Sequence, residues 1–194
     1  MIVPLTRPRG RAGEWAGGMA EQGVGHGARA DAVALARAIY LDERHEFGCA
    51  ETSYMVLKAA FGLDDPMDPS AAVALNGGIA YSGGLCGALT GAALAVGTLA
   101  ERRFADHGRA KRVARELVAG TLEAFREEHG AVDCRDLIGY DLRAPGGHDA
   151  FLASGAWRDG CMRQIEAVVG RLAALADPAV WERAVQEVEA PPED

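Results

Sequence analysis

The residues of this sequence best suited to chemistry are its four cysteines, which lie far apart in the chain but share one kind of local context. Each stands where the neighbouring residues predict the start of a helix: Cys49, Cys86, Cys134 and Cys161. The first turn of a helix presents unpaired backbone N–H groups and a partial positive charge. Both stabilise a thiolate relative to a thiol, and the thiolate is the form that binds a metal or attacks a disulfide. We therefore expect the four thiols to converge on one metal-binding or redox site.

The spacing of the cysteines excludes several common cofactor motifs. They form no Cys-x-x-Cys zinc knuckle and no ferredoxin run, and the absence of Cys-x-x-Cys-His excludes covalently attached haem. The alternative to a site is that the cysteines are small, buried apolar residues. The aspartates just before Cys134 and Cys161, and the glycines around Cys86, favour the site over this alternative.

Glycine is concentrated between residues 76 and 97. Gly83, Gly87 and Gly91 recur every four residues, which in a helix clears one stripe of side chains. A neighbouring helix or a bulky inorganic group could approach the backbone along that stripe, and helices of two subunits could pack through it to form a homodimer. We predict that these three glycines, together with Gly84, contact a cofactor. No Gly-Lys-Ser/Thr follows, so the segment is not a phosphate-binding loop.

The composition places the chain among ordinary globular proteins and excludes some partners. Apolar residues make up 49% of its 194 residues and charged residues 25%, while aromatic residues are only 6%, which together with abundant alanine favours packed helices. The net charge of −8 argues against nucleic-acid binding, which needs a basic surface. We find no membrane span and no secretory signal in the sequence, so we expect a cytoplasmic protein with reduced thiols.

Caps and apolar spacing predict an all-α fold, a compact single-domain bundle of about six to eight helices, several of them short. We expect residues 1–29 to be a disordered extension, with Met19 a second candidate for the first residue, and residues 30–190 to be a helical redox domain. The expected helices cover about 31–39, 49–61, 69–75, part of 76–97, 106–128, and 178–188, with short helices beginning at Asp133, after residues 145–147 and at Asp159.

The chain resembles the family of small helical redox-active proteins named for their C_GCAxxG_C_C cysteine pattern. The resemblance runs from about Asp31 to Leu175, and its most specific part is the block from Gly77 through Cys86-Gly87-Ala88-Leu89-Thr90-Gly91. It implies redox activity centred on the four cysteines. A similar domain in split-Soret cytochromes carries an iron–sulfur cluster beside haem, and only the cluster could carry over to this chain, which lacks haem attachment sites.

These observations predict a soluble redox protein that holds an iron–sulfur cluster on some or all of the four cysteines, for electron transfer or redox catalysis. Two alternatives stay open: a metal-free dithiol/disulfide oxidoreductase, and a structural zinc site that holds the helices together. If only three thiols bind the cluster, the fourth ligand position is open to substrate and the protein is an enzyme. The expected partner is another redox protein or a small-molecule substrate.

Overall fold

The computed structural model describes residues 26–44 and 46–190, and within these ranges the chain is helical with no β-strand. Its eight α-helices are α2 (His26–Tyr40), α3 (Cys49–Ala60), α4 (Gly87–Arg103), α5 (His107–His129), α6 (Cys134–Ile138), α7 (Gly147–Ser154), α8 (Met162–Leu172) and α9 (Pro178–Glu189). A π-helical turn, η1 (Trp157–Cys161), leads into α8, and a 3-10 turn, η2 (Ala173–Ala176), follows it. The predicted all-α fold is confirmed. None of the described helices is both long and apolar enough to cross a bilayer.

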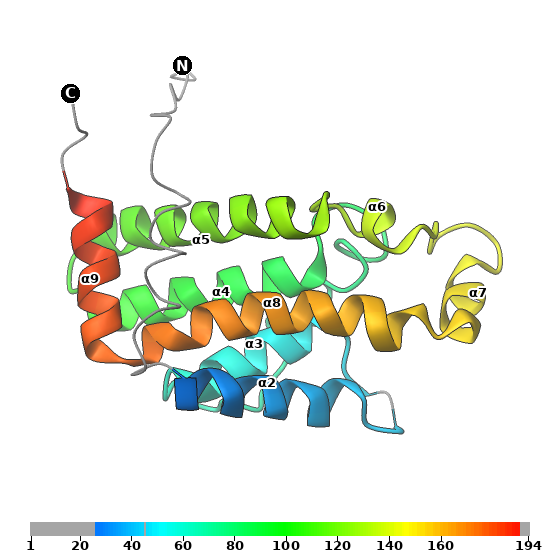
Figure 1. Ribbon diagram of the computed structural model, residues 1–194, viewed down its shortest axis with the longest axis horizontal. Coiled ribbons are helices and arrows are strands. Elements are labelled where there is room, and N and C mark those ends of the chain that lie inside the picture. Colours follow the sequence, from blue (N-terminus) through cyan, green and yellow to red (C-terminus); the bar gives the residue numbers. More distant parts are fainter. Residues whose placement is uncertain (1–25, 45, 191–194) are drawn as a thin grey trace, which may run out of the picture.

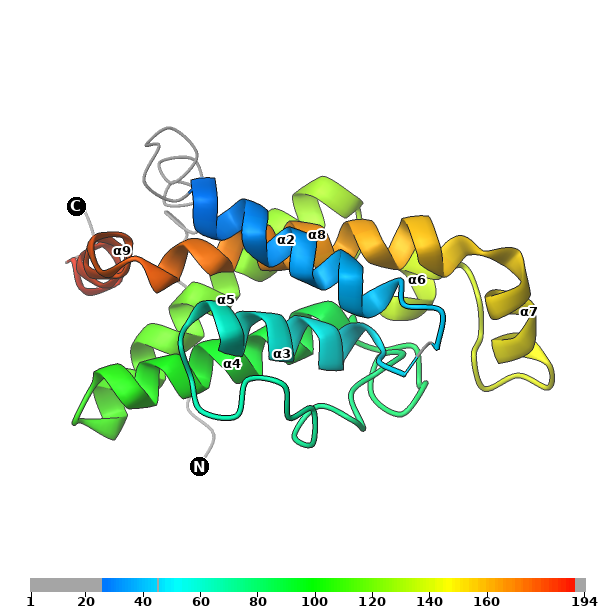
Figure 2. The same ribbon diagram turned by 90° about the horizontal axis from the view of Figure 1, so that it is seen from below.

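The long helices pack side by side, and the short ones close the two ends of the bundle. Figures 1 and 2 show α3 against α4, α4 against α5, and α2 against α8, while α9 crosses one end and α6 and α7 lie at the other. The helix caps predicted from the sequence set several of these boundaries. The Asp106 carboxylate accepts from the Arg109 N–H at 2.6 Å at the start of α5, which ends at Gly130 with φ +78°.

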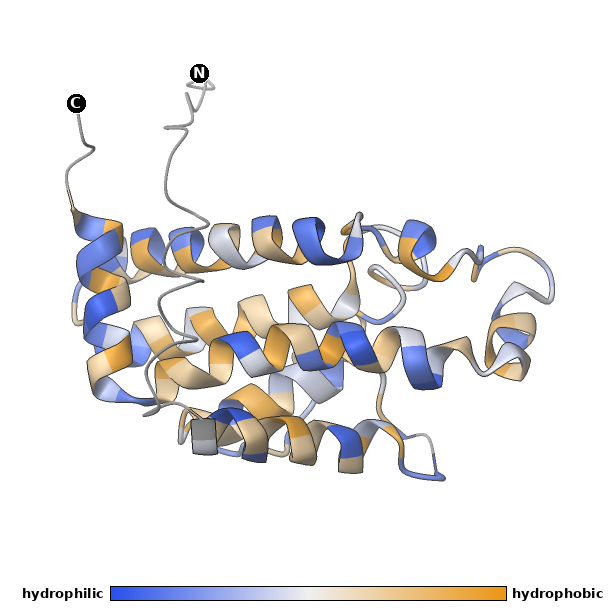
Figure 3. Ribbon diagram, viewed as in Figure 1, coloured by the Kyte–Doolittle hydropathy of each residue, from blue (hydrophilic) through white to orange (hydrophobic). Residues whose placement is uncertain are grey.

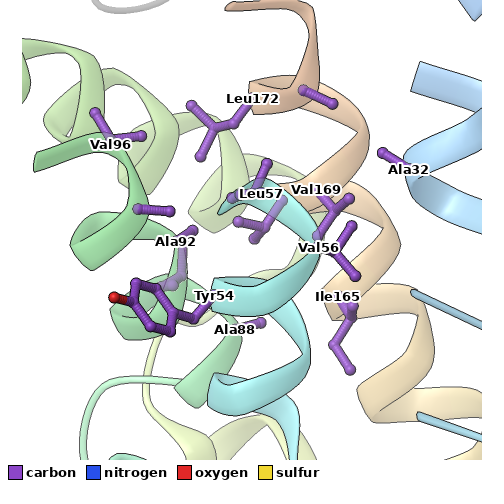
Figure 4. Close-up of a cluster of buried hydrophobic side chains, with 14 of the residues drawn as sticks. Ala32, Tyr54, Val56, Leu57, Ala88, Ala92, Val96, Ile165, Val169 and Leu172 are labelled. Carbon is purple, nitrogen blue, oxygen red and sulfur yellow. The ribbon is translucent and has the colours of Figure 1, made fainter. Parts of the chain in front are cut away.

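The core lies where α3, α4 and α8 meet, with α2 covering one side (Figure 4). Leu57 of α3, Val96 of α4 and Leu172 of α8 are at most 1% exposed. In Figure 3 the apolar colours alternate with polar ones along these helices, as expected for helices that bury one face and expose the other. Burial of this apolar surface is the main stabilising contribution to such a bundle.

Helices α3 and α4 approach each other closely because α4 has no side chain at Gly91. A Cβ atom at this position would lie 2.9 Å from the Ala50 carbonyl carbon and nearer still to its oxygen. The glycine stripe predicted a close approach to the backbone, and at Gly91 the element that approaches is α3 of the same chain. This position is not available for a contact between two subunits, and the homodimer stays a prediction.

Several boundaries differ from the expected ones. Helix α2 begins at His26, so residues 26–29 belong to a helix and not to the expected extension; the rest of the extension lies outside the described residues. Residues 69–75 do not form the expected helix but successive turns: the Ala72 N–H donates to Pro69 O and the Leu75 N–H to Ala72 O, a three-residue spacing where an α-helix has four.

Two predictions about the site segments are also wrong. Asp159 does not cap a helix, because the chain is already helical from Trp157 and the π turn runs directly into α8. Cys161 is therefore inside a helical segment and not at its start. Gly83 lies in the loop before α4, with φ +81°, so it does not extend the stripe of Gly87 and Gly91 along one helix.

Candidate functional site

Three of the four cysteines lie at helix starts, as predicted. Cys49 and Cys134 are the first residues of α3 and α6, and Cys86 is the residue immediately before α4. Cys161 is the last residue of the π turn. All four are free thiols; Cys49 is partly exposed and the other three are buried.

Backbone pairing between two loops joins Cys86 to Cys134. Leu85 and Asp133 form an isolated antiparallel bridge. The Cys86 N–H donates to the Val132 carbonyl at 2.8 Å, and the Cys134 N–H donates to the Gly84 carbonyl at 2.6 Å. The two thiols are thus fixed near each other although 47 residues separate them in the chain.

The four thiols share one neighbourhood. In each of the six pairs that they form, a thiolate charge on one sulfur acts to raise the pKa of the other: Cys49 with Cys86, Cys134 and Cys161; Cys86 with Cys134 and Cys161; and Cys134 with Cys161. Within residues 26–44 and 46–190, however, no three His, Cys, Asp or Glu side chains are gathered tightly enough to hold one metal ion. The four thiols are therefore neighbours that do not form a preassembled site for a single ion among the described residues.

The sulfur of Cys49 is surrounded by backbone N–H groups. Those of Gly77, Ala50 and Gly87, and its own, hydrogen-bond to the sulfur and act to lower the pKa of the thiol. A Cβ atom on Gly87 would overlap this sulfur, so only glycine lets the start of α4 lie against it. These donors come from three segments: the loop before α4, α3 and α4.

Burial nevertheless dominates the acidity of all four thiols. Desolvation raises the pKa of Cys134 and of Cys161 to about 12, and raises the pKa of Cys49 and, more strongly, of Cys86. The expectation that helix starts make these thiols acidic is wrong for the metal-free protein, because the apolar surroundings outweigh the helix dipoles. A positively charged centre bound here would instead displace the protons.

Glu51 and Asn76 support the start of α3, and neither was among the predicted site residues. Asn76 Oδ1 accepts from the Ala50 N–H at 2.9 Å and lies 3.9 Å from the Cys49 sulfur. Its amide donates at 2.7 Å to Glu51 Oε2, which also accepts from the Gly48 N–H at 2.9 Å. The acid three residues after Gly48 is a recognisable cap signal, whereas nothing local marks Asn76.

Tyr40 and Gln164 also contact the thiols and were not predicted. Gln164 Oε1 accepts from the Cys86 thiol at 3.6 Å, and both side chains are buried. The Tyr40 hydroxyl hydrogen-bonds with Cys161, and its ring packs edge-on against Trp157 with centroids 5.8 Å apart. Burial, followed by the charges of neighbouring thiolates, raises the pKa of Tyr40, so its hydroxyl stays a donor.

The Gly77 N–H that hydrogen-bonds to the Cys49 sulfur belongs to a left-handed turn. Residues 77–81 all have positive φ, including Ile79, Ala80 and Tyr81 at +64°, +49° and +61°. Side chains with a Cβ rarely adopt this conformation, which costs about 1–2 kcal/mol per residue. The carbonyl of Ala80 accepts from the Arg143 guanidinium at 2.9 and 3.1 Å, which helps to hold the turn.

The four glycines predicted to contact a cofactor have different neighbours. Gly87 lies against Cys49 and Gly91 against Ala50, as described above. Gly83 faces the Arg135 side chain. A Cβ atom built on Gly84 would lie 3.4 Å from the Gly78 carbonyl oxygen. Their contact with a cofactor stays a prediction, for which Gly87 has the most direct geometry.

We expect the Asn76→Ala substitution to lower the free energy of unfolding by about 1–3 kcal/mol, because it takes the acceptor away from the Ala50 N–H and removes one of the two hydrogen bonds to Glu51 Oε2, which keeps only the bond from the Gly48 N–H. Urea denaturation measures this change. Thr98→Ala is the control, since it removes a hydroxyl that is exposed and bonded only to the Leu94 carbonyl, and it should change stability by less than about 0.5 kcal/mol. Equal effects of the two substitutions would contradict the role of Asn76.

The family model described as "Putative redox-active protein (C_GCAxxG_C_C)" matches residues 47–175, about two thirds of the chain. The chain belongs to this family. The matched range contains all four cysteines, and the resemblance to the C_GCAxxG_C_C family that the order of the cysteines indicated is confirmed. No curated protein and no protein of solved structure matches the chain.

Proposed function

We propose that this member of the redox-active family holds an iron–sulfur cluster on Cys49, Cys86, Cys134 and Cys161 and uses it for electron transfer or redox catalysis. The observation that carries the proposal is that separate segments of the chain bring their thiols together: the start of α4 lies against the Cys49 sulfur, and backbone pairing between two loops holds Cys86 near Cys134. Burial raises the pKa of the Cys161 thiol, which is also close enough for the charges of Cys49 and Cys134 to raise it further. Thiolates are the protein ligands of iron–sulfur clusters.

The surroundings of the thiols fit such a group. The four backbone N–H groups at Cys49 would donate to sulfur, and hydrogen bonds to sulfur are one way in which a protein sets a cluster potential. The absence of a side chain at Gly87 leaves backbone against sulfur. The cluster would supply the one-electron chemistry, while the buried protein ligands hold it and limit the access of water.

Cys49 is the natural point of contact with an electron partner or a substrate. It is the one thiol of the four that is partly exposed, and it begins α3 beside the exposed left-handed turn. If the fourth coordination position is open to substrate, this is the side from which substrate would enter. We propose a second redox protein or a small molecule as the partner there.

The test is to purify the full chain without oxygen and to measure iron, acid-labile sulfide and zinc per protein, together with the visible spectrum. We expect a brown protein with stoichiometric iron and sulfide and with charge-transfer absorption. Iron-free protein that contains zinc would replace the proposal with a structural metal site. Metal-free protein in which alkylation reveals a redox-dependent disulfide would replace it with dithiol chemistry, for which the raised thiol pKa values are unfavourable.

A further inference from the structure

A second region with unassigned chemistry lies on the other side of α2 and α8, away from the core. It is a cavity of about 740 Å³ between α2, α8 and the end of α5, within the size range of small-molecule sites. Figure 2 shows α2 and α8 side by side, and residues of both helices line the cavity. The charged and titratable residues that line it are Arg29, Arg37, Glu128, His129, Arg163 and Glu166. We call it the arginine cavity.

Positive charge is in excess in the arginine cavity, although the whole chain carries a net charge of −8. Arg37 forms an ion pair with Glu166, so these two charges compensate each other. Arg163 donates to a backbone carbonyl, that of Asp159, at 3.2 Å, and neither Arg163 nor Arg29 has an ion pair with a described residue. Glu128, the other carboxylate of the lining, forms no ion pair with either of these arginines, so three arginines against two glutamates leave the lining with one net positive charge.

Charges of both signs lie around this lining. Burial is the largest cause of the lowered pKa of Arg171; the charges of Glu128 and Glu127 act to raise this pKa, and that of Arg29 acts to lower it. Burial also lowers the pKa of His129, and Arg163 lowers it further against the opposing effect of Glu128, so the imidazole is neutral at neutral pH. The buried Nε2 atom of His129 has no hydrogen-bond partner among the described residues, with Glu128 Oε1 at 3.9 Å.

Arg29 and Arg163 stand at opposite ends of the arginine cavity. The Arg29 side chain lies over Gly170, with its Nε 3.2 Å from the position of a Cβ there. Gly170 and Arg163 are seven residues apart on α8, which places them about 10 Å apart along the helix axis. A guanidinium pairs well with a carboxylate or a phosphate through two parallel hydrogen bonds.

We propose that the arginine cavity binds an elongated small molecule with an anionic group, phosphate ester or carboxylate, at each end. One end pairs with Arg29 and the other with Arg163, and the apolar Val33 and Ala167 contact the middle of the ligand. The proposal does not depend on the cluster, because the cavity lies outside the core that contains the thiols. Arg163 follows Cys161 by two residues on the same helical segment, so a bound ligand would also contact the segment that carries a thiol.

The test is calorimetric titration of the full-length, reduced protein at constant ionic strength with two ligands that carry an anionic group at each end, 1,6-hexanediol bisphosphate and suberate. Hexyl phosphate and octanoate, which carry an anionic group at one end only, are the matched single-ended ligands. We expect at least one double-ended ligand to bind saturably, one molecule per chain, and at least about tenfold more tightly than its single-ended match. The tighter-binding of the two double-ended ligands distinguishes a phosphate ester from a dicarboxylate.

Arg29→Gln and Arg163→Gln should each remove most of this tenfold advantage. Both side chains are exposed, so neither substitution should prevent folding. Arg115→Gln is the matched control, because it removes the same charge from an exposed position on α5 that does not line the cavity. The proposal is overturned if neither double-ended ligand binds more tightly than its single-ended match, or if Arg115→Gln weakens binding as much as Arg163→Gln does.

Discussion

The Gly91→Ala substitution is expected to lower the free energy of unfolding by about 3 kcal/mol, the upper part of the range for overpacking a well-filled core. The added methyl group would lie 2.9 Å from the carbonyl carbon of Ala50 and nearer to its oxygen, so it meets backbone and not a flexible side chain. Helices α3 and α4 would have to separate, and α3 carries Cys49 at its start. Urea denaturation measures the loss.

Gly97→Ala is the matched control for this prediction, and its effect should have the opposite sign. Gly97 is on the same helix, and no atom lies within 4 Å of a Cβ built there. Alanine should therefore stabilise the protein by about 0.5–1 kcal/mol, since it reduces the entropy lost on folding. If Gly91→Ala were neutral or stabilising as well, the close contact between α3 and α4 would be wrong.

Cys86→Ser is expected to reduce the iron and sulfide content of anaerobically purified protein at least about tenfold. Loss of a residue that only supports a metal ligand lowers metal affinity by about tenfold or more, and loss of the ligand itself should lower it at least as much. Serine has nearly the same size as cysteine, and its hydroxyl can still donate to Gln164 Oε1. The fold should therefore survive, and elemental analysis together with visible absorption would report the loss of the cluster alone.

Val96→Ala separates this effect from a general loss of stability. Val96 is a fully buried residue on the same helix, and its truncation destabilises the core without removing a thiol. We expect this variant to keep its iron and sulfide while its free energy of unfolding falls. Cys86→Ser protein with unchanged iron would show that Cys86 is not a ligand.

Local sequence signals predicted most of the helices. Asp106 and Gly130 mark the two ends of α5, and Asp177 marks the start of α9, where its carboxylate accepts from the N–H groups of Ala179 and Val180. These caps act within one turn, so they can be read directly from the chain. The same reasoning failed at Asp159, because a π turn is indistinguishable from a new helix start at the level of local caps.

The sequence by itself determined that the protein is helical and that it belongs to a family defined by four cysteines. It also predicted that all four cysteines begin helices, which is correct for Cys49, Cys86 and Cys134 and wrong for Cys161. Cap signals, apolar spacing and the order of the cysteines depend only on residues near one another in the chain or on their order, so they can be read without knowing the tertiary structure.

Only the tertiary structure decided which groups surround the thiols and how acidic they are. Asn76, Gln164 and Tyr40 reach the site across long stretches of sequence, and the left-handed turn brings the Gly77 N–H to Cys49. Desolvation depends on every element packed around a sulfur, and here it outweighs the local helix dipoles. The charge excess of the arginine cavity has the same origin, because it arises only where α2, α5 and α8 meet.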